Sequence, residues 1–202
     1  MARVLLVDCY PDEPKWRPKL ALYQEKLGRF CDLTTIDHRV LAASTPTDGF
    51  EAVVISGSPT MLTRDGVPAG LDAFARKLDL PVLGVCYGHQ VMGLVTGAEL
   101  KKAEFYEDWE TVRIEEHDEL FHGMTRKLRV FQSHAEFLTR RSVEKAGWQV
   151  LADSRRCPVE AMRHRERPFH CVQFHPERSE ETGEKVFENS LRQVAGIREE
   201  DR

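Results

Sequence analysis

The sequence predicts an α/β fold with a mostly parallel central sheet and helices on both faces. Short apolar runs at residues 4–8, 52–56 and 82–85 carry this prediction, because buried parallel strands are nearly continuous hydrophobic segments. Segments with helical spacing separate these runs, and alternating strands and helices are typical of a parallel sheet. A chain of 202 residues is also long enough to bury a sizeable core.

The first half of the chain supplies the alternating elements. The strand at 4–8 precedes a helix at 15–27, in which Leu20, Tyr23 and Leu27 fall on one face. The elements expected next are a strand at 33–36, a strand at 52–56, a helix at 71–78, a strand at 82–85 and the start of a helix at 89–94.

The second half is expected to extend the sheet with more exposed strands. Residues 111–115 and 128–131 alternate apolar and polar side chains, which predicts half-exposed, antiparallel strands. The last predicted elements are strands at 148–151, 159–162 and 169–174 and a closing helix at 182–194. No linker, repeat or low-complexity tract divides the chain, so we expect one domain at 1–196 and a frayed tail at 197–202.

Composition and charge narrow the possible functions. The net charge of −4 and the pI of about 6.1 give no signal for binding nucleic acid or a membrane surface. Five cysteines without framework spacing favour a reducing compartment, and we expect a cytoplasmic location. The apolar run at 4–7 is too short for a signal peptide or a membrane helix. Cys171 and His175 lack a second pair of ligands, so we expect no metal, and we expect no cofactor.

Cys86 ends an apolar strand and begins a helical segment. Gly84 and Gly88 flank it two positions away on either side, which is the G-x-nucleophile-x-G pattern of a sharp strand–turn–helix elbow with cysteine in place of serine. Small neighbours suit a strained turn against which other elements pack closely, and a helix N-terminus favours the reactive thiolate. A buried structural cysteine in a strand is the competing interpretation of this pattern alone.

A second segment favours the catalytic interpretation of Cys86. His175 follows the last predicted strand and is itself followed by Pro176 and Glu177. A histidine can act as the general base toward a cysteine, and a carboxylate can fix the tautomer and orientation of its ring. We therefore expect a catalytic group in the chain order Cys86, His175, Glu177.

The segments 84–90 and 172–177 together resemble the class I, or triad-type, glutamine amidotransferases. The loop Ile-Ser-Gly-Ser-Pro at 55–59 is similar to the oxyanion loop of that family, and the resemblance runs from Val4 to about Val194. It implies the flavodoxin-like fold of the class I amidotransferases and L-glutamine as the substrate.

Within that family, the chain is most similar to the free-standing amidotransferase subunits of GMP synthase. Ser133, His134 and the segment 157–162 carry this closer resemblance. It implies that ammonia passes to a separate synthetase, and the favoured partner is an ATP pyrophosphatase subunit. The 202 residues contain no Walker A loop of their own.

Two backbone segments are expected to bind the oxyanion of an amide-cleaving reaction. One donor is the N–H of Tyr87, directly after the nucleophile. The other comes from Gly57 and Ser58, whose loop follows a parallel strand and therefore reaches the same edge of the sheet. The alternatives for this loop are an ordinary turn or a phosphate cradle. Ser58 stands where the GMP synthase subunits usually carry glycine.

Gln90, Ser133 and His134 are the substrate-binding residues that the resemblance implies. The alternatives are a helix-surface position for Gln90 and a satisfied polar pair at a strand end for Ser133 and His134. Two further positions differ from the GMP synthase pattern: Trp109-Glu110 replaces a common Tyr-Gly, and Glu136 replaces a common Asp.

The sequence leaves two other functions open. A self-sufficient γ-glutamyl peptidase would use the same three catalytic residues, and Ser58 together with the aromatic and acidic segment 105–110 supports it. A flavodoxin-like binding module without catalysis would share the fold but would need no nucleophile. The sequence indicates neither the ammonia acceptor nor the oligomeric state.

Overall fold

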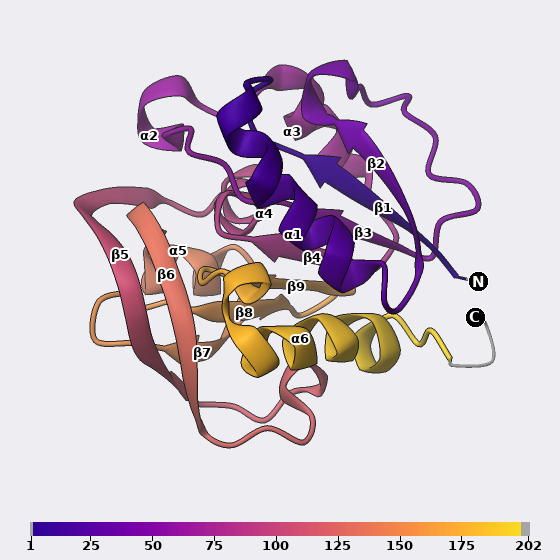
Figure 1. Ribbon diagram of the computed structural model, residues 1–202. Coiled ribbons are helices and arrows are strands. Elements are labelled where there is room, and N and C mark those ends of the chain that lie inside the picture. The colour runs from indigo at the N-terminus through magenta and orange to yellow at the C-terminus, as the bar shows by residue number, and fades with distance from the viewer. Residues whose placement is uncertain (1, 199–202) are drawn as a thin grey trace.

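The computed structural model describes residues 2–198 of the chain (Figure 1). The described strands form one nine-stranded sheet in the order β2-β1-β3-β4-β9-β8-β7-β5-β6. Their bounds are β1 Arg3–Asp8, β2 Asp32–Asp37, β3 Ala52–Ile55, β4 Val82–Val85, β5 Leu100–Ile114, β6 Lys127–Leu138, β7 Trp148–Asp153, β8 Ala161–His164 and β9 Phe169–Val172.

The pairing of the strands changes from parallel to antiparallel at β9. The pairs from β2 to β9 are all parallel, whereas those from β9 through β8, β7 and β5 to β6 are antiparallel. The predicted α/β class is confirmed, and so are the antiparallel strands expected around 111–115 and 128–131. The carboxyl ends of β1, β3, β4 and β9 therefore lie along one edge of the parallel part, where ligands bind in open α/β sheets.

Six α-helices occur within residues 2–198. Their bounds are α1 Arg17–Leu27, α2 Leu62–Asp65, α3 Ala69–Lys77, α4 Tyr87–Val95, α5 Arg140–Lys145 and α6 Glu180–Asn189. The sequence predicted four of them and missed the short helices α2 and α5. The predicted closing helix ends its α-helical part at Asn189 and continues as a π-helical turn at Ser190–Val194.

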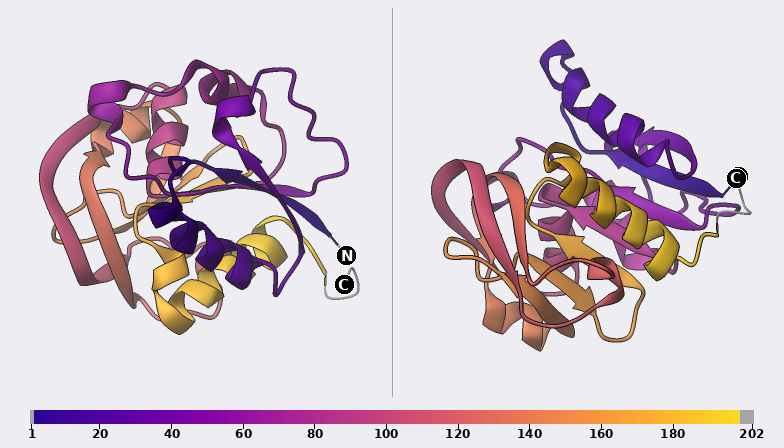
Figure 2. Two further views of the ribbon diagram at one scale, coloured as in Figure 1. Left: turned by 45° about the horizontal axis from the view of Figure 1, so that its top comes forward. Right: turned by 60° about the horizontal axis from the view of Figure 1, so that its bottom comes forward.

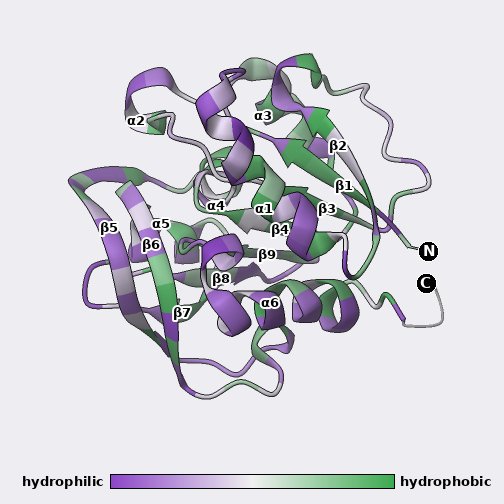
Figure 3. Cartoon of the chain, in the orientation of Figure 1, coloured by the Kyte–Doolittle hydropathy of each residue, from purple (hydrophilic) through white to green (hydrophobic). Residues whose placement is uncertain are grey.

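Helices cover both faces of the parallel strands, as the sequence predicts (Figures 1 and 2). Val4 and Leu6 of β1 share one core with side chains of α1 and α6, whereas Leu5 and Val7 share the other with side chains of α3, α4 and α5. This alternation follows from the two-residue period of a strand. Hydrophobic residues accordingly dominate β1 in Figure 3, while α6 also carries hydrophilic ones.

Strands β5 and β6 pair as a long antiparallel ribbon that curls beside the parallel strands (Figure 1). The sequence predicted only the last part of β5, because most side chains from Leu100 to Trp109 are at least partly exposed and give no clear alternation. Its register shifts between Lys102 and Tyr106, which indicates a bulge or irregularity. The ribbon brings Ser133 and His134 of β6 opposite Glu107 and Tyr106 of β5.

Four further observations concern membrane-spanning helices, metal binding, the cysteines and the predicted tail. In the described part of the chain, no helix is long and apolar enough to cross a membrane, and no group of three or more His, Cys, Asp or Glu is arranged to hold a metal ion. All five cysteines are free and buried. Ile197, at the start of the predicted tail, is buried in the core, while residues 199–202 lie outside the described residues.

Candidate active site

Cys86 lies at the sharp turn between β4 and α4. Its backbone has φ 50° and ψ −99°, an unusual conformation for a residue with a side chain, and it occupies the N-cap position of α4. A Cβ atom at Gly84 would lie 2.8 Å from the carbonyl oxygen of Gly88, and one at Gly88 would lie 2.3 Å from that of Ile55. Both glycines are therefore required by close packing, and the predicted strained elbow is confirmed.

His175 and Glu177 form a buried pair just after β9. The turn Pro176–Arg178 places the Glu177 Oε1 atom 2.6 Å from His175 Nδ1, and the exposed fractions are 1% for Glu177 and 6% for His175. Burial alone would lower the pKa of His175, but the neighbouring Glu177 and Cys86 hold that pKa well above its usual value. The pair therefore favours a charged imidazolium beside the sulfur of Cys86.

The sulfur of Cys86 contacts polar groups from two other elements. The Gln173 Nε2 amide donates to Sγ over 3.5 Å, and the Ser133 carbonyl oxygen lies 3.8 Å from Sγ. The same carbonyl oxygen lies 3.3 Å from His175 Nε2. Cys86 and His175 thus converge on one point of β6, although the sequence places them 89 positions apart.

Gln90 supports this arrangement from inside the protein. It is 3% exposed, rather than lying on the helix surface, and its Nε2 donates to Gln173 Oε1 over 3.1 Å and to the Glu136 carbonyl oxygen over 2.9 Å. Gln90 therefore fixes the amide that contacts Cys86. Gln173 was not predicted from the sequence as a site residue. It could have been, because it lies two residues before His175, and alternate residues of an extended segment point to the same side.

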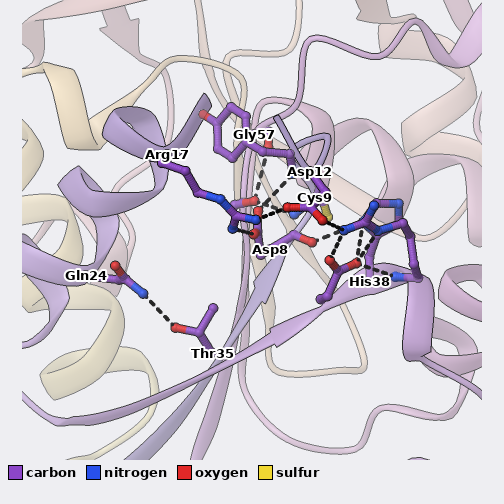
Figure 4. Close-up of polar contacts among 12 residues, drawn as sticks. Asp8, Cys9, Asp12, Arg17, Gln24, Thr35, His38 and Gly57 are labelled. Atoms are coloured by element: carbon purple, nitrogen blue, oxygen red, sulfur yellow. Dashed lines mark hydrogen bonds and ion pairs between the residues drawn. The ribbon is translucent and has the colours of Figure 1, made fainter. Parts of the chain in front are cut away.

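The loop after β3 is held by hydrogen bonds to β1 and α1. Ser56 Oγ accepts from the Cys9 N–H over 2.9 Å, and the Gly57 N–H donates to the Tyr23 hydroxyl over 3.0 Å. Figure 4 shows this region, with Asp8, Cys9 and Gly57 close together and Arg17 directed toward the Asp8 carboxylate. A Cβ at Gly57 would lie 3.2 Å from His175 Cε1, so the loop packs directly against the histidine ring.

Two backbone N–H groups of the expected oxyanion site have no acceptor among the described residues. Within residues 2–198, the N–H of Ser58 has no backbone or side-chain acceptor, and the N–H of Tyr87 is at the first position of α4, where no intrahelical acceptor exists. The Gly57 N–H is engaged by Tyr23, so it is not in the same position to bind an anion. The Ser58 hydroxyl is turned toward Thr60.

Ser133 and His134 face the same site from β6. The Ser133 hydroxyl donates to Glu107 Oε1 over 3.3 Å. His134 Nδ1 lies 3.2 Å from the Glu136 carbonyl oxygen, and burial, followed by the effect of His175, lowers the pKa of His134 to about 4. His134 is therefore neutral at physiological pH and is not a candidate for the charged partner of Cys86.

Glu136 lines the cavity and also holds the start of helix α2 against β6. Its carboxylate accepts from the N–H groups of Leu62 and Thr63 over 2.9 and 2.8 Å and from the Thr63 hydroxyl. These are unpaired donors at the start of α2, so Glu136 ties that short helix to β6. This replacement of the common Asp retains a buried, fully bonded carboxylate.

A cavity of about 360 Å³ opens over Cys86 and His175. The predicted residues Ser58, Gln90, Ser133, His134 and Glu177 line it. Other lining residues were not predicted from the sequence, among them Tyr10, Trp16, Lys19, Glu107 and Arg178. These residues come from the loop after β1, from α1, from β5 and from the turn after β9. No periodic pattern in the sequence connects such distant positions.

The aromatic segment of β5 contributes one aromatic side chain to the cavity. Phe105 lines the opening and is 62% exposed. Tyr106 and Trp109 are instead covered by the guanidinium groups of Arg156 and Arg129, at 4.1 and 4.0 Å from the ring centres. Of the predicted aromatic cluster, only Phe105 therefore lines the cavity.

Comparison with known proteins gives consistent matches over most of the chain. The family model described as glutamine amidotransferase class-I matches residues 13–194. A glutamine-hydrolyzing GMP synthase subunit from Pyrococcus abyssi is 32% identical over 175 residues, which cover 83% of this chain and 90% of that protein. The protein of the same name from Archaeoglobus fulgidus is 37% identical over 149 residues, covering 70% and 76% of the two chains.

A solved structure shares the fold as well. A Thermoplasma acidophilum protein, provisionally described as a GMP synthase subunit, aligns with a TM-score of 0.78 and 22% identity over 97% of this chain and 94% of its own. The fold, the extent of the family match and the identity to the two archaeal relatives lead to one conclusion. The chain belongs to the class I glutamine amidotransferase family.

Proposed function

We propose that this protein hydrolyses the side-chain amide of L-glutamine through a covalent intermediate on Cys86. The observation that carries the proposal is the convergence of three groups on one cavity: Cys86 at a strained N-cap, and the His175–Glu177 pair at 2.6 Å. A nucleophile, a proton-transferring base and a carboxylate that orients the base are the parts that covalent acyl transfer requires.

The proposed reaction has two steps. The sulfur of Cys86 attacks the amide carbon, the carbon–nitrogen bond breaks, and ammonia leaves with a proton from His175, which forms a γ-glutamyl thioester. Water then attacks the same carbon, gives a proton to His175, and releases glutamate as the carbon–sulfur bond breaks. Glu177 keeps the Nδ1 proton of His175 in place, so that Nε2 serves the reacting atoms.

The oxyanion of each tetrahedral intermediate is assigned to the N–H groups of Ser58 and Tyr87. Both belong to turns at the carboxyl ends of neighbouring parallel strands, and neither donates to another described residue. Gly57 contributes space rather than a donor, because its N–H is bonded to Tyr23 and a side chain there would press on His175. Preorganised donors of this kind contribute on the order of 3 kcal/mol each to transition-state stabilisation.

Substrate binding is assigned to residues that line the cavity. Ser133 and His134 line it and offer backbone groups to the amino-acid part of glutamine, and Gln90 acts through the Gln173 amide that it holds. We further propose that the ammonia passes to a separate ATP pyrophosphatase subunit. The support is the similarity to two archaeal GMP synthase subunits and the lack of a Walker A loop in the 202 residues.

A γ-glutamyl peptidase is the second candidate, and one observation favours it. Trp16 and the exposed Phe105 lie at the same cavity as Cys86, and Trp16 is stacked on Tyr10 with ring centres 6.1 Å apart. Such an apolar surface could bind a leaving group larger than ammonia. The two functions differ in what leaves the thioester step and in whether a partner matters.

The test compares L-glutamine with γ-glutamyl dipeptides, each with and without ATP, xanthosine monophosphate and a synthetase subunit. We expect weak ammonia release that rises when the nucleotides and the synthetase are added, and no release by Cys86→Ala. Cys31→Ala is the matched control and should keep the activity, because Cys31 is buried away from the cavity. Rapid partner-independent cleavage of the dipeptides would instead establish the peptidase.

A further inference from the structure

Among residues 2–198, two lysine or arginine side chains line the cavity over Cys86, and only one of them is neutralised. Arg178 Nη1 lies 2.9 Å from Glu107 Oε1, and its guanidinium also lies 3.8 Å from the centre of the Phe131 ring. Lys19, from the first turn of α1, lines the same cavity, and no carboxylate in the described part of the chain lies within 4.0 Å of its ammonium.

The carboxylates of the cavity are already committed. Glu177 is bonded to His175, Glu107 to Arg178 and the Ser133 hydroxyl, and Glu136 to the N–H groups of Leu62 and Thr63. None of these three carboxylates lies within 4.0 Å of the Lys19 ammonium. Burial and the nearby Arg178 lower the pKa of Lys19, and they outweigh the opposite effect of the more distant carboxylates of Glu107 and Glu177.

We propose that Lys19 binds the α-carboxylate of L-glutamine and thereby selects substrates in which this carboxylate is free. The proposal rests on the proposed function, since it names the substrate contact of that same site. L-Glutamine carries its amide at one end and both an ammonium and a carboxylate at the other. With the amide at Cys86, Lys19 is the cavity cation that lacks a contacting carboxylate among the described residues and is therefore the partner assigned to the α-carboxylate.

The fold gives Lys19 a fixed position for this task. The neighbouring Leu20 and Tyr23 are buried in the core, and the Tyr23 hydroxyl accepts from the Gly57 N–H beside His175. Helix α1 therefore links the lysine to the loop that carries Ser58. A substrate held by Lys19 would be positioned relative to the catalytic groups by one rigid element.

Binding to the inactive Cys86→Ala protein measures this contact without turnover. Isothermal titration calorimetry compares L-glutamine with L-glutaminamide, in which a neutral amide of similar shape replaces the α-carboxylate. Adding Lys19→Gln should raise the Kd of L-glutamine about tenfold or more, as expected for loss of a charge-assisted contact. The Kd of L-glutaminamide should stay within about twofold, because its binding never used the charge.

Two further variants separate charge recognition from damage to the fold. Lys19→Arg should recover most of the L-glutamine affinity, since it keeps a cation at the same place. Lys101→Gln removes the same charge from an exposed position outside the cavity and should leave both Kd values unchanged. An unchanged Kd for L-glutamine in Lys19→Gln, or an equal loss for both ligands, would overturn the proposal.

The result also separates this inference from the proposed function. If the unmodified protein binds L-glutamine but never releases ammonia, with or without a synthetase, the hydrolysis proposal fails and the Kd comparison still decides the role of Lys19. If L-glutamine does not bind to Cys86→Ala at all, the role of Lys19 is refuted. If ammonia is released and Lys19→Gln leaves the Kd unchanged, only the assignment of Lys19 is wrong.

Discussion

At the scale of single residues, local environment distinguishes Cys86 from the other four cysteines. Burial raises the pKa of Cys31 to about 12, and it raises those of Cys9, Cys157 and Cys171 still further. These four thiols therefore stay protonated at neutral pH. Cys86 instead lies at a helix N-cap and beside an imidazole whose pKa is raised, which is the setting in which a thiolate becomes nucleophilic.

The role assigned to Glu177 predicts a change in both rate and pH dependence. Glu177→Gln should lower kcat by up to about 10⁴-fold, because the orientation of His175 is lost. The carboxylate raises the pKa of His175, and the protonated imidazolium is the form that gives a proton to the leaving ammonia, so removal of the carboxylate should also move the basic limb of the kcat/KM profile to lower pH. Steady-state ammonia release measured across pH tests both effects.

The control for this variant is Glu181→Gln, which removes a carboxylate from an exposed position of α6. It should leave the rate and the pH profile unchanged. A Glu177→Gln protein with normal kcat and an unshifted profile would remove Glu177 from the site.

His89 predicts a loss of stability in acid. Burial lowers its pKa to about 3, whereas an unfolded histidine has a pKa of about 6.5. The unfolded state binds more protons between these values, so the stability contribution is present above about pH 6.5 and is lost as the pH falls toward 3. Between about pH 7 and about pH 5, this one residue should cost about 2 kcal/mol.

The measurement is the free energy of unfolding in urea at both pH values, for the unmodified chain and for His89→Leu. The variant should lose about 2 kcal/mol less over that pH interval, whatever its absolute stability. The same pH dependence in both proteins would mean that His89 is not held neutral in the fold.

At the scale of elements, the best predictions came from segments whose pattern is local. The spacing of Leu20, Tyr23 and Leu27 identified the buried face of α1, and the glycines around Cys86 identified the elbow. Helix α2 could not be predicted in this way, because its four residues are too short for a periodic pattern and depend on the Glu136 carboxylate of β6. Glu107, Arg178 and Lys19 meet only through tertiary structure.

The close packing around the turn at Cys86 predicts that Gly84 and Gly88 are needed for both stability and activity. Gly88→Ala would place a Cβ 2.3 Å from the Ile55 carbonyl oxygen, and we expect a loss of about 1–3 kcal/mol together with loss of ammonia release. Urea unfolding and the glutaminase assay measure the two effects.

Gly97→Ala provides the comparison for this variant. Gly97 has φ +99°, but a Cβ there would meet nothing within 4 Å. We expect a destabilisation on the order of 1 kcal/mol from backbone strain alone and an active enzyme. If Gly88→Ala were as stable and as active as Gly97→Ala, the close packing of the elbow would not matter for the site.

At the scale of the whole molecule, the site lies at the carboxyl ends of four parallel strands, next to the antiparallel ribbon of β5 and β6. The loops after β1, β3, β4 and β9 bring Tyr10, Ser58, Cys86 and His175 to one edge of the sheet, and β6 adds Ser133 from above. The parallel part was predictable from apolar runs, and so was the meeting of its loops. Of the ribbon, only the segments at 111–115 and 128–131 were predicted, because the side chains from Leu100 to Trp109 are at least partly exposed and show no clear alternation.

The most direct test of the proposed chemistry is covalent labelling by a glutamine-mimicking diazo ketone, followed by peptide mass mapping. We expect one adduct per chain, on Cys86, slowed by L-glutamine and absent in Cys86→Ala, while Cys9, Cys31, Cys157 and Cys171 stay unmodified. Labelling of a different cysteine, or ammonia release from L-glutamine by Cys86→Ala at the rate of the unmodified protein, would contradict the role of Cys86 as the nucleophile.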